Sequence, residues 1–207
     1  PKIFVATSAR VANVAFSAGS LLEGFENRLA KGQPLSAPND VRRYFISHEE
    51  AAQLCLLACF LGEDGQVFFP KLAAEKHLIG FPDIAAALLA ECGLEPLLCG
   101  SGEEARRLSP PPAGSWPCYF APSNTSGEKM EEEFFRREDS LDLKSFQAAG
   151  IVREKAAPRE TLRAFFAEIE AIRAKPHWRQ EDVLAAIKAA VPELDHTDRG
   201  FNLDQKM

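Results

Sequence analysis

The sequence has few residues that could carry out catalysis alone. Its 207 residues include two tyrosines and four histidines. Neither tyrosine is followed four positions later by a lysine, the pairing that lowers a tyrosine pKa for proton transfer. There is no Gly-x-Ser-x-Gly motif for a nucleophilic serine, and the histidines lack the spacing of metal ligands. We therefore expect no catalytic residue and no metal site in this chain.

Cysteines are too few and too irregularly spaced for a disulfide framework. The number is odd, and no Cys-x-x-Cys pair occurs. Cys55 and Cys59 could share a helical face and bind a metal, although packing in a core is the simpler interpretation. Reduced cysteines predict a cytoplasmic protein. The five are Cys55, Cys59, Cys92, Cys99 and Cys118.

Long apolar runs and excess positive charge are absent as well. No run approaches the length of a membrane span, and the first residues do not form a signal peptide. The formal net charge is −6 and the basic pairs are dispersed, which argues against a nucleic-acid partner. A small anionic ligand is compatible with this charge because it needs one local pocket. The chain opens on an apolar stretch without a methionine, so we expect it to be part of a larger gene product.

Alternating strand and helix signals predict an α/β fold with a mostly parallel sheet. The final part is purely helical, so we expect one domain at 1–157 and a helical hairpin with a polar tail at 158–207. We interpret residues 35–38 as an extended connector and 131–133 as the solvated first turn of a helix. The expected strands are 3–6, 9–15, 42–47, 67–69, 94–99 and 118–120, and the expected helices are 21–31, 48–61, 82–92, 103–108, 160–175 and 181–191.

Residues 10–20, R-V-A-N-V-A-F-S-A-G-S, lead from a strand through small residues into a helix. Ser20 and Glu23 form a capping box, so the amides and positive dipole end of the helix face the loop before it. A phosphate would be favoured there. The alternative is that Asn13 and Ser17 only satisfy backbone groups of the turn.

Further anion-binding candidates are Arg42, Arg43 and Lys71, which end or follow predicted strands. Arg42 and Arg43 are adjacent on a strand and point to opposite faces. At most one of them can therefore enter a given pocket.

Four segments follow one another in the order RVANVAFSAGS, VRRYFISHEEA, VFFPKL and TSGEKMEE. Together they resemble the C-terminal half of bacterial nucleotide-sugar 4,6-dehydratases, which are extended short-chain dehydrogenases/reductases of the polysaccharide-biosynthesis type. The closing helices and the LDQKM tail resemble a UDP-N-acetylglucosamine 4,6-dehydratase branch. The resemblance implies that an N-terminal Rossmann part binds NAD or NADP and that this part holds a UDP- or GDP-linked N-acetylhexosamine. It also implies a homo-oligomer.

The resemblance also implies substrate-binding roles for individual residues. Asn13 matches the asparagine that contacts the substrate diphosphate, and Arg43 matches a phosphate-binding arginine, with Arg42 as its rival. The loop after Asn13 contributes Ser17, Gly19 and Ser20, and the Pro-Lys pair contributes Lys71. The G-E-K-x-x-E segment contributes Glu128, Lys129 and Glu132, which would contact the nucleotide or its ribose.

The chain departs from the family at the catalytic centre. The glycine-rich loop, the Tyr-Lys pair and the acid/base residues all belong upstream of Pro1, so we expect this segment alone to be inactive. In the intact enzyme the implied reaction moves a hydride from C4 to NAD(P)⁺, eliminates water across C5 and C6, and returns the hydride to C6. The alternatives are a nucleotide-sugar epimerase of the same superfamily and a non-catalytic α/β interaction module.

Overall fold

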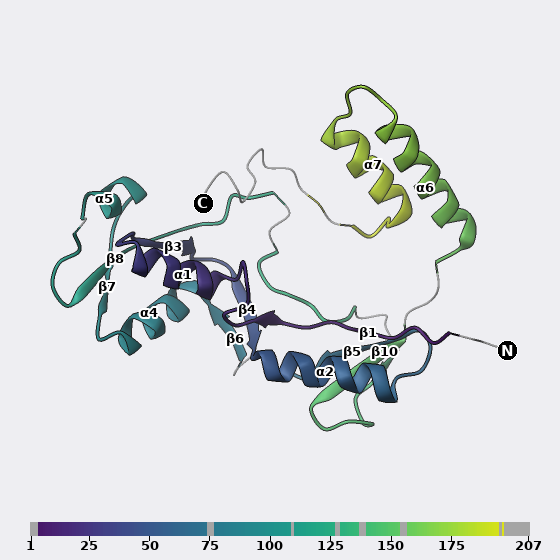
Figure 1. Cartoon of the computed structure of the whole chain (residues 1–207), viewed down its shortest axis with the longest axis horizontal. Coiled ribbons are helices and arrows are strands. Elements are labelled where there is room, and N and C mark those ends of the chain that lie inside the picture. The colour runs from purple at the N-terminus through teal and green to yellow at the C-terminus, as the bar shows by residue number, and fades with distance from the viewer. Residues whose placement is uncertain are drawn as a thin grey trace. The chain divides into compact units, whose positions relative to one another are not determined.

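The structure is a computed structural model that describes residues 4–73, 77–108, 110–126, 129–136, 140–153, 157–194 and 196. The chain divides into two compact units. The first comprises residues 1–124 and 128–154, and the second comprises residues 125–127 and 155–207. Figure 1 labels the elements of both units.

A parallel sheet in the order β3-β8-β7 forms one part of the first unit. Its strands are β3 (Leu35–Pro38), β8 (Ser115–Ala121) and β7 (Glu95–Leu98). Helices α1 (Leu21–Ala30) and α4 (Phe81–Glu91) contribute apolar side chains to the core at this sheet (Figure 1). That core contains Leu22, Phe25, Leu35, Ala37, Ile84, Ala85, Leu89 and Cys118.

A mixed sheet in the order β1-β5-β10-β9 forms another part. β1 (Ser8–Ala9) is parallel to β5 (Gln66–Pro70), while β10 (Ala149–Arg153) is antiparallel to β5 and to β9 (Leu141–Asp142). Helix α2 (His48–Leu61) packs on it and starts with the predicted capping box. Their shared core contains Leu54, Ala58, Phe68, Ala149 and Ile151.

A third sheet, in the order β2-β4-β6, lies next to the candidate site. β2 (Asn13–Val14) is parallel to β4 (Arg42–Ile46), and β4 is antiparallel to β6 (Leu78–Gly80). Helix α5 (Gly102–Arg107) follows β7 and contacts β8.

The second unit contains a helical hairpin. Helices α6 (Arg159–Arg173) and α7 (Gln180–Ala190) pack against each other. Both helices agree with the sequence prediction to within a few residues at each end.

The prediction of an α/β fold is confirmed, but several local predictions are wrong. Residues 4–7 form no strand, and the apolar run at 9–15 supplies two short strands to different sheets. Residues 35–38 are a strand, because Leu35 and Ala37 point into the core while Ser36 is exposed. Residues 131–133 are not helical. Strands β6, β9 and β10 were not predicted.

No helix in the described part of the chain is both long and apolar enough to cross a membrane. The same residues contain no group of three or more histidine, cysteine or acidic side chains that could hold a metal ion.

Candidate functional site

A cavity of about 250 Å³ lies at the N-terminus of α1. Its wall is formed by β2, which carries Asn13, and by the turn that joins β2 to α1, which carries Ser17. Two aromatic side chains add an apolar surface, namely Phe45 of β4 and Phe81 of α4. The full lining is Asn13, Val14, Ser17, Ala18, Gly19, Ser20, Leu21, Phe45 and Phe81.

The turn has a fixed and partly strained backbone. Ser17 donates its hydroxyl hydrogen to the Val14 carbonyl oxygen at 2.8 Å, and the Ser20 amide donates to the Ser17 carbonyl at 2.9 Å. Gly19 has φ +76° and Phe16 has φ +58°. Phenylalanine rarely adopts this left-handed conformation, which costs about 1–3 kcal/mol and is concentrated at functional sites.

The first turn of α1 presents hydrogen-bond donors to the cavity. Ser20 is the N-cap, and its Oγ accepts from the Glu23 amide at 3.2 Å. The Glu23 carboxylate accepts from the Gly19 amide at 2.6 Å, whereas the predicted capping box would bring it to the Ser20 amide. The first amides of a helix have no intrahelical acceptor, so those of Leu21 and Leu22 can serve an anion. Glu23 occupies one donor of this loop.

Asn13, Arg43 and Glu132 lie together beside this turn. Asn13 Nδ2 donates to Glu132 Oε2 at 3.2 Å and to the Tyr44 carbonyl at 3.3 Å. Arg43 Nε lies 3.6 Å from Glu132 Oε1. One carboxylate therefore bridges an amide group and a guanidinium group that come from neighbouring strands.

Arg43 is held in place by several further contacts. Its side chain is only 11% exposed. Its Nη1 donates to the carbonyls of Arg42 at 2.9 Å and Met130 at 3.3 Å. Its Cζ lies 5.9 Å from the ring centroid of Phe81, which lines the cavity. A guanidinium over an aromatic ring is stabilised by a cation–π interaction.

The segment that carries Glu132 is attached to the sheets at several points. Arg10 Nη1 donates to the Phe134 carbonyl at 2.8 Å, and the Arg42 amide donates to the Met130 carbonyl at 2.9 Å. The Phe134 ring lies 5.3 Å from that of Tyr44. Residues 131–133 therefore run along the sheets and do not start a helix, and the Glu131 and Glu132 carboxylates contact arginine and asparagine side chains.

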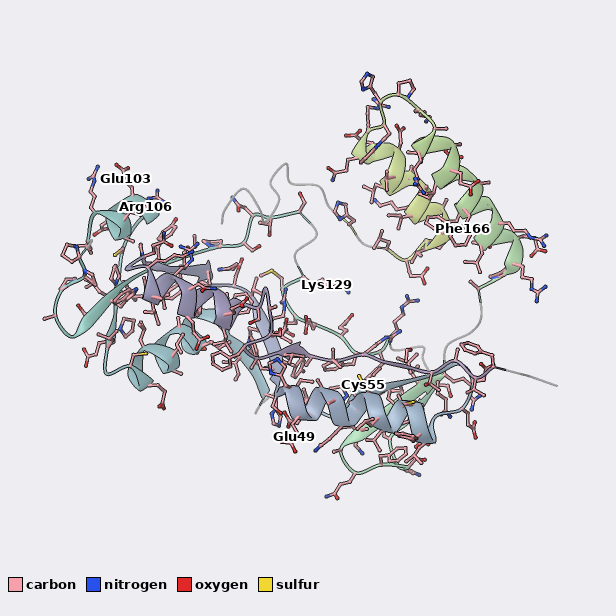
Figure 2. The ribbon with its side chains drawn as sticks, viewed as in Figure 1. Glu49, Cys55, Glu103, Arg106, Lys129 and Phe166 are labelled. Atoms are coloured by element: carbon pink, nitrogen blue, oxygen red, sulfur yellow. The ribbon has the colours of Figure 1, made fainter. Side chains whose placement is uncertain are left out.

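The other predicted site residues lie elsewhere. Arg42 points away from Arg43, is 51% exposed, and lies 3.7 Å from Glu131. Lys71 Nζ donates to the carbonyls of Leu143 and Phe146 at 2.9 and 2.7 Å, so it fastens a loop next to β9. Lys129 is exposed and is labelled in Figure 2. Glu128 lies outside the described residues.

Two aromatic residues of the cavity were not identified from the sequence. Phe45 is the register partner of Asn13 across the β2–β4 pair. Phe81 begins α4, directly before Pro82. Pairing between predicted strands at 9–15 and 42–47 could have indicated Phe45, but no local pattern indicates Phe81.

The turn before α1 does not have the sequence of a dinucleotide-binding turn. It reads S-A-G-S, whereas the Rossmann fingerprint is G-x-G-x-x-G.

Comparison with known proteins gives the family. A protein of Methanocaldococcus jannaschii, named as an uncharacterized membrane protein, is 27% identical over 144 residues, which are 69% of this chain and 38% of that protein. The X-ray structure of Pen from Bacillus thuringiensis matches with a TM-score of 0.55 and 19% identity, over 80% of this chain and 50% of that chain. This likeness concerns the fold alone. The chain thus spans half or less of the length of these relatives. Residues 2–154 match the family described as polysaccharide biosynthesis protein, and the chain therefore belongs to that family.

Proposed function

We propose that this chain is the substrate-binding part of an NAD(P)-dependent nucleotide-sugar 4,6-dehydratase that serves polysaccharide biosynthesis. The observation that carries the proposal is the cavity at the α1 N-terminus, with Asn13 and the nearly buried Arg43 beside it. The family membership supports a role in sugar metabolism. The four segments that resemble such dehydratases include this turn and the strand of Arg43.

The chemistry of the cavity suits a diphosphate group. A helix N-terminus supplies amide donors and a positive dipole end. A guanidinium group can bind two phosphate oxygens at once, and Asn13 can donate one more hydrogen bond. The rings of Phe45 and Phe81 form an apolar surface for the part of the ligand next to the phosphates.

Glu132 has two roles in this proposal. Without substrate, its carboxylate holds the Asn13 and Arg43 donors in position. When the diphosphate takes over these donors, the carboxylate turns to the ribose hydroxyls. Hydroxyl groups donate well to a carboxylate, and the negative charge then lies away from the phosphates.

The remaining parts of the reaction belong to the longer enzyme. A Rossmann part of that enzyme would hold NAD or NADP, which would supply the hydride chemistry at C4 and C6 of the sugar. This chain binds and orients the nucleotide, so that the sugar extends toward those groups.

The test is product formation by the longer protein that contains this chain. The protein is incubated with NAD(P)⁺ and with UDP- or GDP-linked N-acetylhexosamines, and the products are analysed by mass spectrometry. We expect a 4-keto-6-deoxy sugar that is lighter than the substrate by one water. Arg43→Ala should raise KM by at least about tenfold, because a charge-assisted phosphate contact is lost, whereas the control Arg42→Ala should change it little.

Three results would separate the alternatives. An epimerised product of unchanged mass would replace the dehydratase with an epimerase. Absence of any nucleotide-sugar product, together with no stabilisation by UDP or GDP, would favour a non-catalytic interaction module. Equal effects of Arg42→Ala and Arg43→Ala would remove Arg43 from the site.

A further inference from the structure

The ring of Phe81 connects the hydrophobic core with the candidate site. It packs against the core formed by α1, α4 and the β3-β8-β7 sheet, and it also lines the cavity at the N-terminus of α1. The Arg43 guanidinium lies over the same ring, with its Cζ 5.9 Å from the ring centroid. A ring that is held by the core can therefore hold the guanidinium in turn.

Strand pairing places Phe81 beside Arg43. β6 runs antiparallel to β4, and Ile79 of β6 is the register partner of Arg43. α4 begins directly after β6, at Phe81, and Pro82 follows in its first turn. Proline is favoured there because the amides of the first turn have no intrahelical acceptor and because its ring fixes φ. The start of α4, and with it Phe81, is thus attached to the strand that carries Arg43.

The contacts of the Arg43 guanidinium differ in what a ligand does to them. Nη1 donates to the carbonyls of Arg42 and Met130, which are part of the backbone. Nε lies 3.6 Å from the Glu132 carboxylate, which the proposed diphosphate displaces. The contact with Phe81 is on the face of the guanidinium, so it uses none of the N–H donors that a phosphate needs. Phe81 can therefore hold Arg43 while the ligand is bound.

We propose that Phe81 is a positioning residue, which keeps the Arg43 guanidinium at the cavity when a diphosphate takes the place of the Glu132 carboxylate. The inference rests on the proposed function, because it concerns the diphosphate site. With one face covered by the ring, the guanidinium is reached along its edge, where it can bind two phosphate oxygens at once. Without the ring, the arginine side chain gains rotamer freedom, and the ligand has to order it again at a cost in affinity.

The first test measures pyrophosphate binding to the full chain by isothermal titration calorimetry, because pyrophosphate reports on the diphosphate site alone. Phe81→Leu should raise Kd about three- to thirtyfold, since it removes the cation–π contact of a nearly buried guanidinium. Phe81→Tyr keeps the aromatic ring and should bind within about twofold of the wild type. Phe120→Leu is the matched control, because its ring packs against the same core outside the cavity lining, and its Kd should stay that of the wild type.

A double variant tests whether Phe81 acts through Arg43. Arg43→Ala should weaken pyrophosphate binding, and Phe81→Leu should add no further loss in that background, because the group that the ring positions is gone. A full additional loss would mean that Phe81 contacts the ligand directly, and this would overturn the positioning role. An unchanged Kd for Phe81→Leu, or an equal rise for Phe120→Leu, would overturn it as well.

The same titrations separate this inference from the proposed function. If the wild-type protein does not bind pyrophosphate, the diphosphate site is wrong and the role of Phe81 is wrong with it. If the wild-type protein binds pyrophosphate and Phe81→Leu binds it equally well, the diphosphate site stands and only the role of Phe81 is overturned.

Discussion

Replacing Glu132 by glutamine separates the two roles proposed for this residue. In the structure its carboxylate accepts a hydrogen bond from Asn13 Nδ2 at 3.2 Å and lies 3.6 Å from Arg43 Nε. A diphosphate that binds the same donors must displace this carboxylate. Glutamine keeps the size of the side chain and can still accept from Asn13, but it removes the charge next to Arg43.

The expected magnitude follows from the burial of the two partners. Arg43 is nearly buried and Glu132 is about one third exposed. The pair should therefore contribute more than a surface ion pair but less than a buried one, or about 1–2 kcal/mol together with the Asn13 hydrogen bond. Since 1.4 kcal/mol corresponds to a factor of ten, Glu132→Gln should bind inorganic pyrophosphate about 5–30 times more tightly than the wild type does.

The assay is a thermal-shift titration with pyrophosphate and with UDP. Glu132→Gln should increase the affinity for UDP less than the affinity for pyrophosphate, because the ribose loses its carboxylate partner. Glu131→Gln is the control, since it removes the same charge from an exposed pair with Arg42 and should leave pyrophosphate binding almost unchanged. If Glu132→Gln binds pyrophosphate as weakly as the wild type, or gains no more than Glu131→Gln does, the carboxylate does not occupy the diphosphate site.

Three further predictions concern the scaffold. Gly150→Ala should lower the free energy of unfolding by about 1–3 kcal/mol in denaturant titrations, because the new methyl group would overlap the buried ring of Phe69; an unchanged midpoint would contradict the close approach. The Ser145 hydroxyl and nearby amides lower the pKa of Asp142 from 3.8 to about 2. The folded state is therefore stabilised by the ionised carboxylate above about pH 4 and loses this stabilisation as the pH falls toward 2. Between pH 4 and pH 2, the free energy of unfolding of Asp142→Asn should therefore fall less than that of the wild type. Burial raises the pKa of the Cys118 thiol to about 11, with a smaller contribution from its neighbour Cys99, so Ellman's reagent at pH 8 should modify Cys118 only after unfolding.

Helix positions were predictable from the sequence because their signals are local. Ser47 and Glu50 form the expected capping box of α2, and Ser20 caps α1. Gly93, with φ +69°, follows the end of α4 as predicted. A cap needs only residues within one turn of the helix end, and all of them are visible in a short stretch of sequence.

Sheet membership could not be predicted because strand pairing depends on residues far away in the chain. The apolar run at 9–15 reads as one strand, yet Ser8–Ala9 pairs with β5 and Asn13–Val14 pairs with β4. No property of the run itself shows where it passes from one sheet to another. β10 pairs with β5 across almost eighty residues of sequence and was missed for the same reason.

At the candidate site, too, local features could be predicted from the sequence, whereas contacts between distant segments could not. Alternation along β4 indicated that only one of Arg42 and Arg43 could enter a pocket, but it did not indicate which. The choice depends on Phe81 and on the segment around Glu132, both distant in sequence. Lys71 could not be separated from the site by sequence either, because its two carbonyl partners lie 72 and 75 residues further along the chain.

A nucleoside diphosphate is proposed to bind at the N-terminus of α1. Titrating the ¹⁵N-labelled protein with UDP and following its amide resonances tests this binding, because the measurement detects weak binding and identifies the residues involved. We predict the largest shifts at Gly19, Ser20 and Leu21, together with the side-chain amide of Asn13, and little change at Lys71. Shifts confined to other elements, or no saturable shift at millimolar UDP, would contradict the assignment of this cavity as the diphosphate site.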